Sequence, residues 1–232
     1  MTGVAADEAA RVDGLRHAQT LARRLFDAIE DAGTIRPGIT EREASDAIKR
    51  LAADVLGVER HWHKRVIRAG ANTLLPYRAN PPLRVIEDDD IVYADLGPIF
   101  EEWEADFGRT YVFGDDPEKL RLTAALPRAF DAGRAFFEQT ADITGDQLFE
   151  FMVAEGERHG YEWGGTIAGH LVGQFPHDLA EGDEDYSRVT PGNDRPMRGL
   201  DSAGRVCHWI LEVHLVDRER QIGGFYEELL DL

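Results

Sequence analysis

The chain is poor in several residue types, and each shortage excludes a class of protein. One cysteine, Cys207, among 232 residues excludes an internal disulfide. No stretch approaches the roughly 18 consecutive apolar residues that span a bilayer. The first residues, MTGVAADEAARVDG, contain neither the basic segment nor the apolar segment of a leader peptide. We therefore expect a cytoplasmic protein without a membrane partner.

Positive charge is also scarce. The sequence has 44 acidic and 26 basic residues, which gives a formal net charge of −18. A surface of that sign repels phosphate backbones, so we expect no nucleic acid partner. Only three of the basic residues are lysines, so a GC-rich genome or a salty cytoplasm explains the bias as well as a function does. Hydrophobic residues make up 43% of the chain, the proportion of a folded globular protein.

Helical and strand-rich stretches alternate along the chain. Hydrophobic spacing and capping residues predict four helices, at roughly 8–32, 40–56, 117–140 and 144–159. Thr40 and Glu43 have the spacing of a capping box, and Thr144 is the expected cap of the last helix. The stretches HWHKRVIRAG and DDDIVYADLGPIFEEWEADFGRTYVFG are rich in β-branched and aromatic residues, which predicts strands and hairpins.

The two halves of the chain have the same order of elements. In each half a long helix is followed by a shorter, capped helix and then by a strand-rich stretch. The capped helices, GITEREASDAIKRLAADVLG and DITGDQLFEFMVAEGERHG, lie about a hundred residues apart. No obvious linker separates the halves. We therefore predict one α+β domain over residues 1–232, with two pseudo-symmetric helix–hairpin halves around a central antiparallel sheet.

Two aspartates stand eleven residues apart in strand-like sequence. Asp95 lies in VYADLG and Asp106 in EADFGRT, and the GPIFEEW segment between them is typical of a hairpin. Paired strands bring both carboxylates to one place, where they repel each other unless a proton or a cation neutralises them. A metal ion is the natural way to neutralise them, although two aspartates of this spacing, taken alone, are more often solvated residues at strand ends.

A glycine-rich segment, GHLVGQFPH, holds two histidines seven residues apart, His170 and His177. Glycine lets the backbone approach a ligand closely, and histidine serves as a metal ligand or a proton carrier. One histidine is therefore available for metal and the other for substrate. Histidines near turns commonly have no catalytic role, so the segment alone leaves the choice open.

Acidic residues interrupt the last two apolar strands. In ILEVHLV, Glu212 and His214 alternate onto one face, and a buried glutamate without a partner is unfavourable. An edge strand with a solvated face is the alternative. The segment GGFYEELL places Glu227 or Glu228 in a closing strand. Strand neighbours face opposite sides, so only one of the two can join the other acids.

Together these segments resemble the pita-bread metallopeptidases, a family that includes methionine aminopeptidase, aminopeptidase P, prolidase and creatinase. Five motifs occur in the family's order: an Asp in D-x-G, an Asp in D-x-x-R-T, GH-x-x-G-x-x-x-H, a strand Glu and a final Glu. The resemblance covers roughly residues 8–232. The segments RAGANTLLPY and EADFGRTYV are most similar to the aminopeptidase P and prolidase branch.

The resemblance implies a site for two divalent ions of Mn, Co, Fe or Zn, among which oxygen-rich ligands do not choose. The implied ligands are Asp95, Asp106, His170, Glu212 and Glu227. Asp106 and Glu227 bridge both ions in this reading, and Glu227 is preferred over Glu228 because it follows an aromatic residue and precedes a polar one. A metal-bridging hydroxide is then the nucleophile. His177 contacts the substrate or the developing oxyanion, and Tyr77 and His214 are further substrate contacts.

We therefore expect a two-metal hydrolase that cleaves a small peptide or amide, in the manner of an Xaa-Pro aminopeptidase or dipeptidase. One departure weakens this reading, because Pro76 stands where the family's peptidases carry a substrate histidine. A same-fold enzyme that acts on a non-peptide C–N substrate, or as a lyase, is thus an alternative. His61 or His63 either compensates from the neighbouring strand or packs at the surface or in the core. A metal-free peptide-binding module is the remaining alternative, although such modules usually lack several ligands.

Length is a second departure. Relatives of the aminopeptidase P, prolidase and creatinase type carry an additional N-terminal domain that shapes substrate selection and dimerisation. We expect only the catalytic domain here, as in methionine aminopeptidase. An exposed sheet edge and the family resemblance favour a homodimer.

Overall fold

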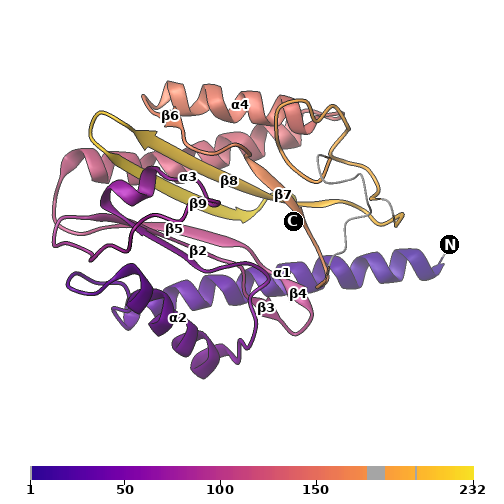
Figure 1. Cartoon of the computed structure of the whole chain (residues 1–232). Helices are drawn as coiled ribbons and strands as arrows, with labels where there is room; N and C mark the ends of the chain where they lie inside the picture. The colour runs from indigo at the N-terminus through magenta and orange to yellow at the C-terminus, as the bar shows by residue number, and fades with distance from the viewer. Residues whose placement is uncertain (1, 177–185, 202) are drawn as a thin grey trace.

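Four helices pack on one curved sheet in the computed structural model, which describes residues 2–176, 186–201 and 203–232 (Figure 1). The helices are α1 (Thr2–Asp31), α2 (Glu41–Leu56), α3 (Pro117–Gln139) and α4 (Gly145–Arg158). All four predicted helices are confirmed. Within the described ranges, no helix is both long enough and apolar enough to cross a membrane.

Capping residues set the starts of the two shorter helices. The Thr40 hydroxyl accepts a hydrogen bond from the Glu43 N–H at 3.1 Å, and the Glu43 carboxylate accepts one from the Thr40 N–H at 2.8 Å. Thr144 and Gln147 form the same reciprocal pair at the start of α4. Both predicted caps are therefore present, and each satisfies backbone donors that the first helical turn leaves unpaired.

The strands form one main sheet and one small hairpin. The main sheet contains β1 (Val66–Ala69), β2 (Ile91–Leu96), β5 (Phe107–Val112), β6 (Glu162–Trp163), β7 (Gly169–Val172), β8 (His208–Asp217) and β9 (Ile222–Leu229). The hairpin joins β3 (Ile99–Phe100) to β4 (Trp103–Glu104), and a short 3-10 helix, η1 (Gly70–Leu74), follows β1. The segment between Asp95 and Asp106 thus contains a hairpin of its own.

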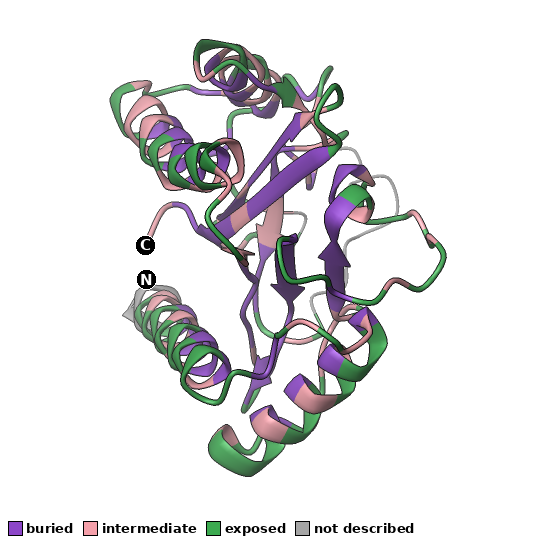
Figure 2. Cartoon of the chain, turned by 90° about the vertical axis from the view of Figure 1, so that its left-hand side faces the viewer, coloured by how far each residue is buried: buried purple, intermediate pink, exposed green. Residues whose placement is uncertain are grey.

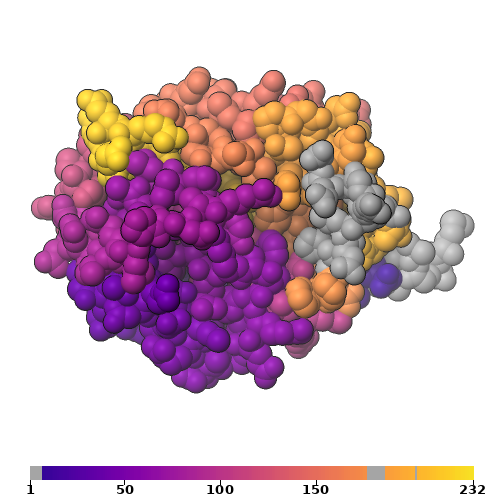
Figure 3. Space-filling model, in the orientation of Figure 1, coloured from indigo at the N-terminus to yellow at the C-terminus, as the bar shows by residue number. Residues whose placement is uncertain are grey.

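The second half of the chain repeats the strands of the first half in reverse order across the sheet, as a pseudo-twofold axis requires. The main sheet runs β1-β2-β5-β9-β8-β6, with β7 pairing to β8, and every pairing is antiparallel. The first half supplies β1, β2 and β5, and the second half supplies β9, β8 and β6, so the seam lies between β5 and β9. Figure 3 shows the purple segments of the first half meeting the orange segments of the second half on the face seen in Figure 1. The predicted pseudo-symmetric halves are confirmed.

All four helices cover the same face of the sheet, and buried residues line the strands and the inner sides of the helices (Figure 2). On β2, Ala94 and Leu96 join the core formed with α1 and α2. On β8, Leu211 joins the core formed with α3 and α4. Strand residues alternate between faces, so Asp95 and Glu212 point away from the helices. The carboxylates of Asp95 and Glu212 therefore lie on the uncovered face.

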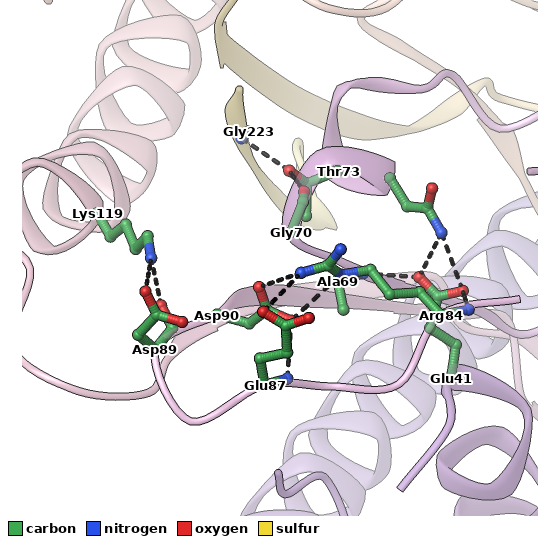
Figure 4. A network of polar contacts seen from close by, with 11 residues as sticks. Glu41, Ala69, Gly70, Thr73, Arg84, Glu87, Asp89, Asp90, Lys119 and Gly223 are labelled. Carbon is green, nitrogen blue, oxygen red and sulfur yellow. Dashed lines mark hydrogen bonds and ion pairs between the residues drawn. The ribbon is translucent and has the colours of Figure 1, made fainter. Parts of the chain in front are cut away.

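A buried glutamate holds η1 in place (Figure 4). Glu41 is 6% exposed, and its carboxylate accepts hydrogen bonds from the Ala69 N–H at 2.8 Å and the Asn72 amide at 2.9 Å. From η1 itself, the Thr73 hydroxyl accepts a hydrogen bond from the Gly223 N–H at 2.8 Å. Since Glu41 begins α2 and Gly223 lies on β9, η1 is tied to both halves of the molecule.

Candidate metal centre

One row of residues across four strands gathers three acidic side chains. The register pairs Asp95 on β2 with Gly108 on β5. Gly108 pairs with Glu227 on β9, which in turn pairs with Glu212 on β8. Paired residues of an antiparallel sheet share a face. A Cβ at Gly108 would lie 2.6 Å from the Phe225 ring and 3.1 Å from the Glu227 Cβ, so glycine leaves the space between the carboxylates open.

His170 reaches this row from β7, whose pairing with β8 depends on a glycine. Gly169 has a φ of 145°, and a Cβ there would lie 2.0 Å from the Ile210 carbonyl oxygen. Only glycine permits so close an approach. The next residue, His170, pairs with Ile210 and projects towards the acidic row.

Asp106 lies at the centre of the cluster, immediately before β5. The His170 Nε2 atom is 3.1 Å from the Asp106 Oδ2 atom, 3.7 Å from the Glu212 Oε1 atom and 3.8 Å from the Glu227 Oε1 atom. Asp106 and Glu227 are only 3% and 2% exposed, so these charges are removed from bulk water. The structure therefore brings together all five residues that the sequence marks as ligands.

His63, whose role the sequence leaves open, lies in the same cluster. Its Nε2 atom is 3.0 Å from the Asp106 Oδ1 atom and 3.5 Å from the Asp95 Oδ1 atom. The Trp62 ring packs edge-on against His63 and His170, with centroids 4.5 and 5.3 Å apart. His63 precedes β1 and belongs to no strand, so no periodic pattern in the sequence marks it.

Burial and mutual repulsion act strongly on the carboxyl groups. Burial, with the charges of neighbouring carboxylates, raises the pKa of Asp95 to about 7, although His63 opposes the rise. Burial also raises the pKa of Glu212 to about 7 against the opposing effect of His170. The pKa of Glu227 lies well above its usual value, again through burial and then through its acidic neighbours. Each raised pKa means that a negative charge on that carboxyl group is unfavourable within the cluster.

Asp106 is the exception, since two imidazoles contact it. Burial raises its pKa, but the contacts with His63 and His170 outweigh burial and hold the pKa below its usual range. Burial lowers the pKa of both histidines, and the neighbouring carboxylates, Asp106 foremost, raise it to about 9 in each case. The cluster thus requires positive charge beside Asp106, from protons or from metal ions.

The donor set fits a pair of divalent ions. One group of ligand atoms comes from His63, Asp95 and Asp106 and another from Asp106, His170 and Glu227; within each group the atoms lie within 4.8 Å of one another. Asp106 belongs to both groups. The Glu227 Oε2 atom is buried without a hydrogen-bond partner among the described residues, an unfavourable state that a cation relieves. Carboxylates with imidazole suit Mn, Fe, Co and Zn ions.

Comparison with known proteins identifies the family. Residues 13–216 match the family model described as Metallopeptidase family M24. The chain belongs to family M24. The predicted resemblance to this family is thereby confirmed.

Individual relatives support the fold of this M24 chain. It is 26% identical over 161 residues to an Xaa-Pro dipeptidase of Lactobacillus helveticus, and the aligned segment covers 69% of this chain and 41% of the relative. The structure of an X-Pro aminopeptidase from Thermotoga maritima MSB8 superimposes with a TM-score of 0.74 at 20% identity, over 95% of this chain and 58% of that one. A methionine aminopeptidase from Rickettsia prowazekii gives a TM-score of 0.65 at 16% identity, over 94% and 95% of the two chains. The predicted pita-bread fold is confirmed, and the chain spans about half the length of the first two relatives.

Two residues of the M24 chain stand at the rim of the cluster. Pro76 is exposed in place of the histidine that the resemblance leads one to expect. Tyr77 is 44% exposed, and its ring meets His63 edge-on with centroids 5.8 Å apart. The Lys64 ammonium lies 4.6 Å from the centroid of the same ring. Tyr77 is thus placed where a substrate at the cluster could touch it, and that role remains a prediction.

His214 lies deeper than a direct substrate contact requires. It is 5% exposed, between Tyr93 and Phe225, and its Nε2 atom is 2.8 Å from the Thr73 carbonyl oxygen. Burial lowers its pKa to about 4, so the ring is neutral and donates this hydrogen bond. The observed contact holds η1 against β8, and the predicted substrate contact is untested. His177 lies outside the described residues.

Glu228 points to the opposite face from Glu227. It forms ion pairs with Arg109 and, at 3.2 Å, with Arg23 of α1. Its carboxylate also accepts a hydrogen bond from the Tyr226 hydroxyl at 2.9 Å. Adjacent glutamates therefore have separate surroundings, one in the acidic cluster and one under α1.

Proposed function

We propose that this chain is a two-metal-dependent peptide hydrolase whose ions are held by Asp95, Asp106, His170, Glu212 and Glu227. The observation that carries the proposal is that Asp106 is shared between two groups of ligand atoms. A single carboxylate between two such groups is the arrangement expected of a bridging ligand. The unpaired Glu227 Oε2 atom and the repulsion among the carboxyl groups further support it.

Divalent ions bound at this site supply a Lewis acid that activates water and polarises the amide carbonyl. The protein holds the ligand side chains in fixed positions and keeps bulk water away from them. Asp95 on β2 pairs with β5 and Glu212 on β8 pairs with β9, so both carboxylates stand on the hydrogen-bonded sheet, which holds ligands rigidly. Trp62 donates its indole N–H to the Ala105 carbonyl oxygen at 3.0 Å, which fixes the ring against His63 and His170. Trp62 thus excludes water from one side of the cluster.

Short peptides with an Xaa-Pro bond are the substrates that the comparisons favour. The relatives named above include an Xaa-Pro dipeptidase and an X-Pro aminopeptidase. Tyr77 offers an exposed aromatic ring beside the cluster, and proline rings pack well on such surfaces. In the absence of a histidine at Pro76, a second candidate is hydrolysis of a non-peptide C–N bond or lyase chemistry at the same site.

Turnover with defined substrates tests the proposal. Xaa-Pro dipeptides, Xaa-Pro tripeptides, Met-Xaa dipeptides and non-peptide amides are incubated with protein in Mn, Co or EDTA. We expect metal-dependent cleavage of an Xaa-Pro substrate, abolished by EDTA and in Asp106→Ala. Cleavage restricted to the non-peptide amides would favour the second candidate. Turnover that persists in EDTA and in Asp106→Ala would refute a metal-dependent mechanism.

A further inference from the structure

His63 and His170 have the same local construction around Asp106. The Nδ1 atom of each ring is within hydrogen-bond distance of the carbonyl oxygen of the next residue. His63 Nδ1 lies 2.7 Å from the Lys64 oxygen, and His170 Nδ1 lies 2.8 Å from the Leu171 oxygen. The Nε2 atoms face the two oxygens of one carboxylate, His63 at 3.0 Å from Oδ1 and His170 at 3.1 Å from Oδ2. Asp106 thus has one imidazole on each side.

This construction is that of a metal-ligating histidine. A carbonyl oxygen only accepts hydrogen bonds, so the Nδ1 atom of each ring carries a hydrogen, and once the Nε2 proton is lost to make room for a cation the Nε2 lone pair points at Asp106. Histidine ligands of metals almost always donate the other N–H to a carbonyl or carboxylate, which fixes the ring's orientation. A cation between the Nε2 atom and the carboxylate satisfies both groups.

The space around His63 is shaped to hold its ring. A Cβ at Gly97 would lie 2.1 Å from the His63 Cδ2 atom and 2.3 Å from its Nε2 atom, so the imidazole occupies the volume that this glycine leaves free. The Trp62 N–H donates to the Gly97 carbonyl oxygen at 2.9 Å, which fixes the two backbones together. The His63 side chain is 7% exposed, less than the 16% of His170. His63 is therefore packed in place and is not a mobile surface residue.

We infer that His63 supplies a second nitrogen ligand, to the ion held by Asp95 and Asp106. This inference rests on the proposed function, because it requires the two-metal site. It gives each ion an imidazole, one from each half of the molecule. Imidazole ligands suit Zn and Fe ions, whereas carboxylates alone suit Mn and Mg. His63 therefore shifts the site towards zinc and iron and away from manganese.

Proton NMR of the cobalt-loaded protein tests the inference without using activity. A histidine bound to Co(II) through Nε2 shows a strongly shifted, solvent-exchangeable signal from its Nδ1–H. We expect two such signals in the unmodified protein and one in His63→Ala. His61→Ala is the matched control, because it removes a histidine of the same segment whose Nε2 atom has no hydrogen-bond partner in the described structure. It should keep both signals.

The affinity for cobalt is a second, independent test of whether His63 is a ligand. Loss of an outer-shell partner alone weakens metal binding about 10- to 100-fold, so loss of a ligand should weaken cobalt binding at least about tenfold in His63→Ala and in His63→Gln. One exchangeable shifted signal in the unmodified protein, with unchanged cobalt affinity in both variants, would overturn the inference and leave the proposed function intact. Failure of the unmodified protein to bind cobalt at all would overturn both. The signal count in the unmodified protein is informative even where a variant does not fold.

Discussion

Adjacent glutamates on β9 provide an internal test, because Glu227 faces the acidic cluster and Glu228 faces α1. Glutamine has nearly the same size as glutamate, so Glu227→Gln and Glu228→Gln each replace one carboxyl group by an amide, on opposite faces of one strand. We expect the two variants to separate fold stability from metal binding. The comparison needs no knowledge of the substrate.

Glu228→Gln should destabilise the fold with or without metal. The Glu228 side chain is 7% exposed and the side chain of its partner Arg109 is 21% exposed, so the variant leaves a half-buried guanidinium without its counter-charge. A hydrogen bond to a charged group contributes about 1.5–3 kcal/mol. The Arg23 side chain is 59% exposed, so its ion pair with Glu228 contributes little to the free energy of unfolding. We therefore expect a Tm lower by roughly 3–12 °C for a domain of this size.

Glu227→Gln should behave in the opposite way. Burial and acidic neighbours raise the pKa of Glu227 well above its usual value, so an uncharged amide costs the metal-free protein little. Metal at a hundredfold excess over its Kd stabilises a protein by about 2.7 kcal/mol, or roughly 5–11 °C here. Glu227→Gln should lose most of that gain, whereas Glu228→Gln should retain it.

Thermal melts followed by circular dichroism, in EDTA and in excess Mn, measure both quantities. The expected pattern is a lower Tm in both conditions for Glu228→Gln, and for Glu227→Gln a metal-free Tm within about 2 °C of the unmodified protein with little metal-induced rise. If Glu228→Gln lost the metal-induced rise and Glu227→Gln kept it, the assignment of faces and of the closing ligand would be wrong.

The other predictions concern three histidines. His170→Ala should lose turnover and at least one ion by elemental analysis, while its circular dichroism spectrum shows a folded chain; full metal content would contradict this. His177→Ala should keep its metal and lower kcat by about 100- to 1000-fold, the range for an oxyanion contact, and metal loss as complete as in His170→Ala would refute it. Burial lowers the pKa of His208, but hydrogen bonds with Asp231 at 2.9 Å and Glu8 at 2.8 Å outweigh burial and raise it. Its contribution to stability is then complete below about pH 6.5 and is lost as the pH rises through the folded-state pKa. Urea unfolding of the unmodified protein and His208→Gln at pH 6 and pH 9 should show a gap that shrinks at pH 9, and a constant gap would contradict the assignment.

Local signals in the sequence predicted the helices well. The Thr40–Glu43 capping box and the Thr144 cap depend on residues three positions apart, so short-range chemistry determines them. Alternation along β8 correctly predicted that Glu212 and His214 share a face. On β9 alternation left Glu227 and Glu228 undecided, because apolar residues lie on both faces of that strand.

Residues that meet only through the fold were beyond sequence reasoning. His63 contacts Asp106 across 43 positions of chain, and the contact depends on the pairing of β1 with β2 and of β2 with β5. The burial of Glu228 depends on Arg109 and on α1 in the same way. The packing of His214 on η1 depends on the Glu41 network, which joins α2 to the segment after β1.

If two ions share Asp106, the metal content per chain falls when this carboxylate is removed. The unmodified protein, Asp106→Ala and Asp46→Ala are dialysed to equilibrium against Mn or Co and measured by elemental analysis with protein quantitation. Asp46 is a matched control, because its side chain is 56% exposed, lies 4.0 Å from Arg65 and belongs to none of the groups of possible metal ligands among the described residues. We predict close to two ions per chain in the unmodified protein and in Asp46→Ala, and at most one in Asp106→Ala. No bound metal in the unmodified protein, or two ions retained by Asp106→Ala, would rule out a pair of ions that share Asp106.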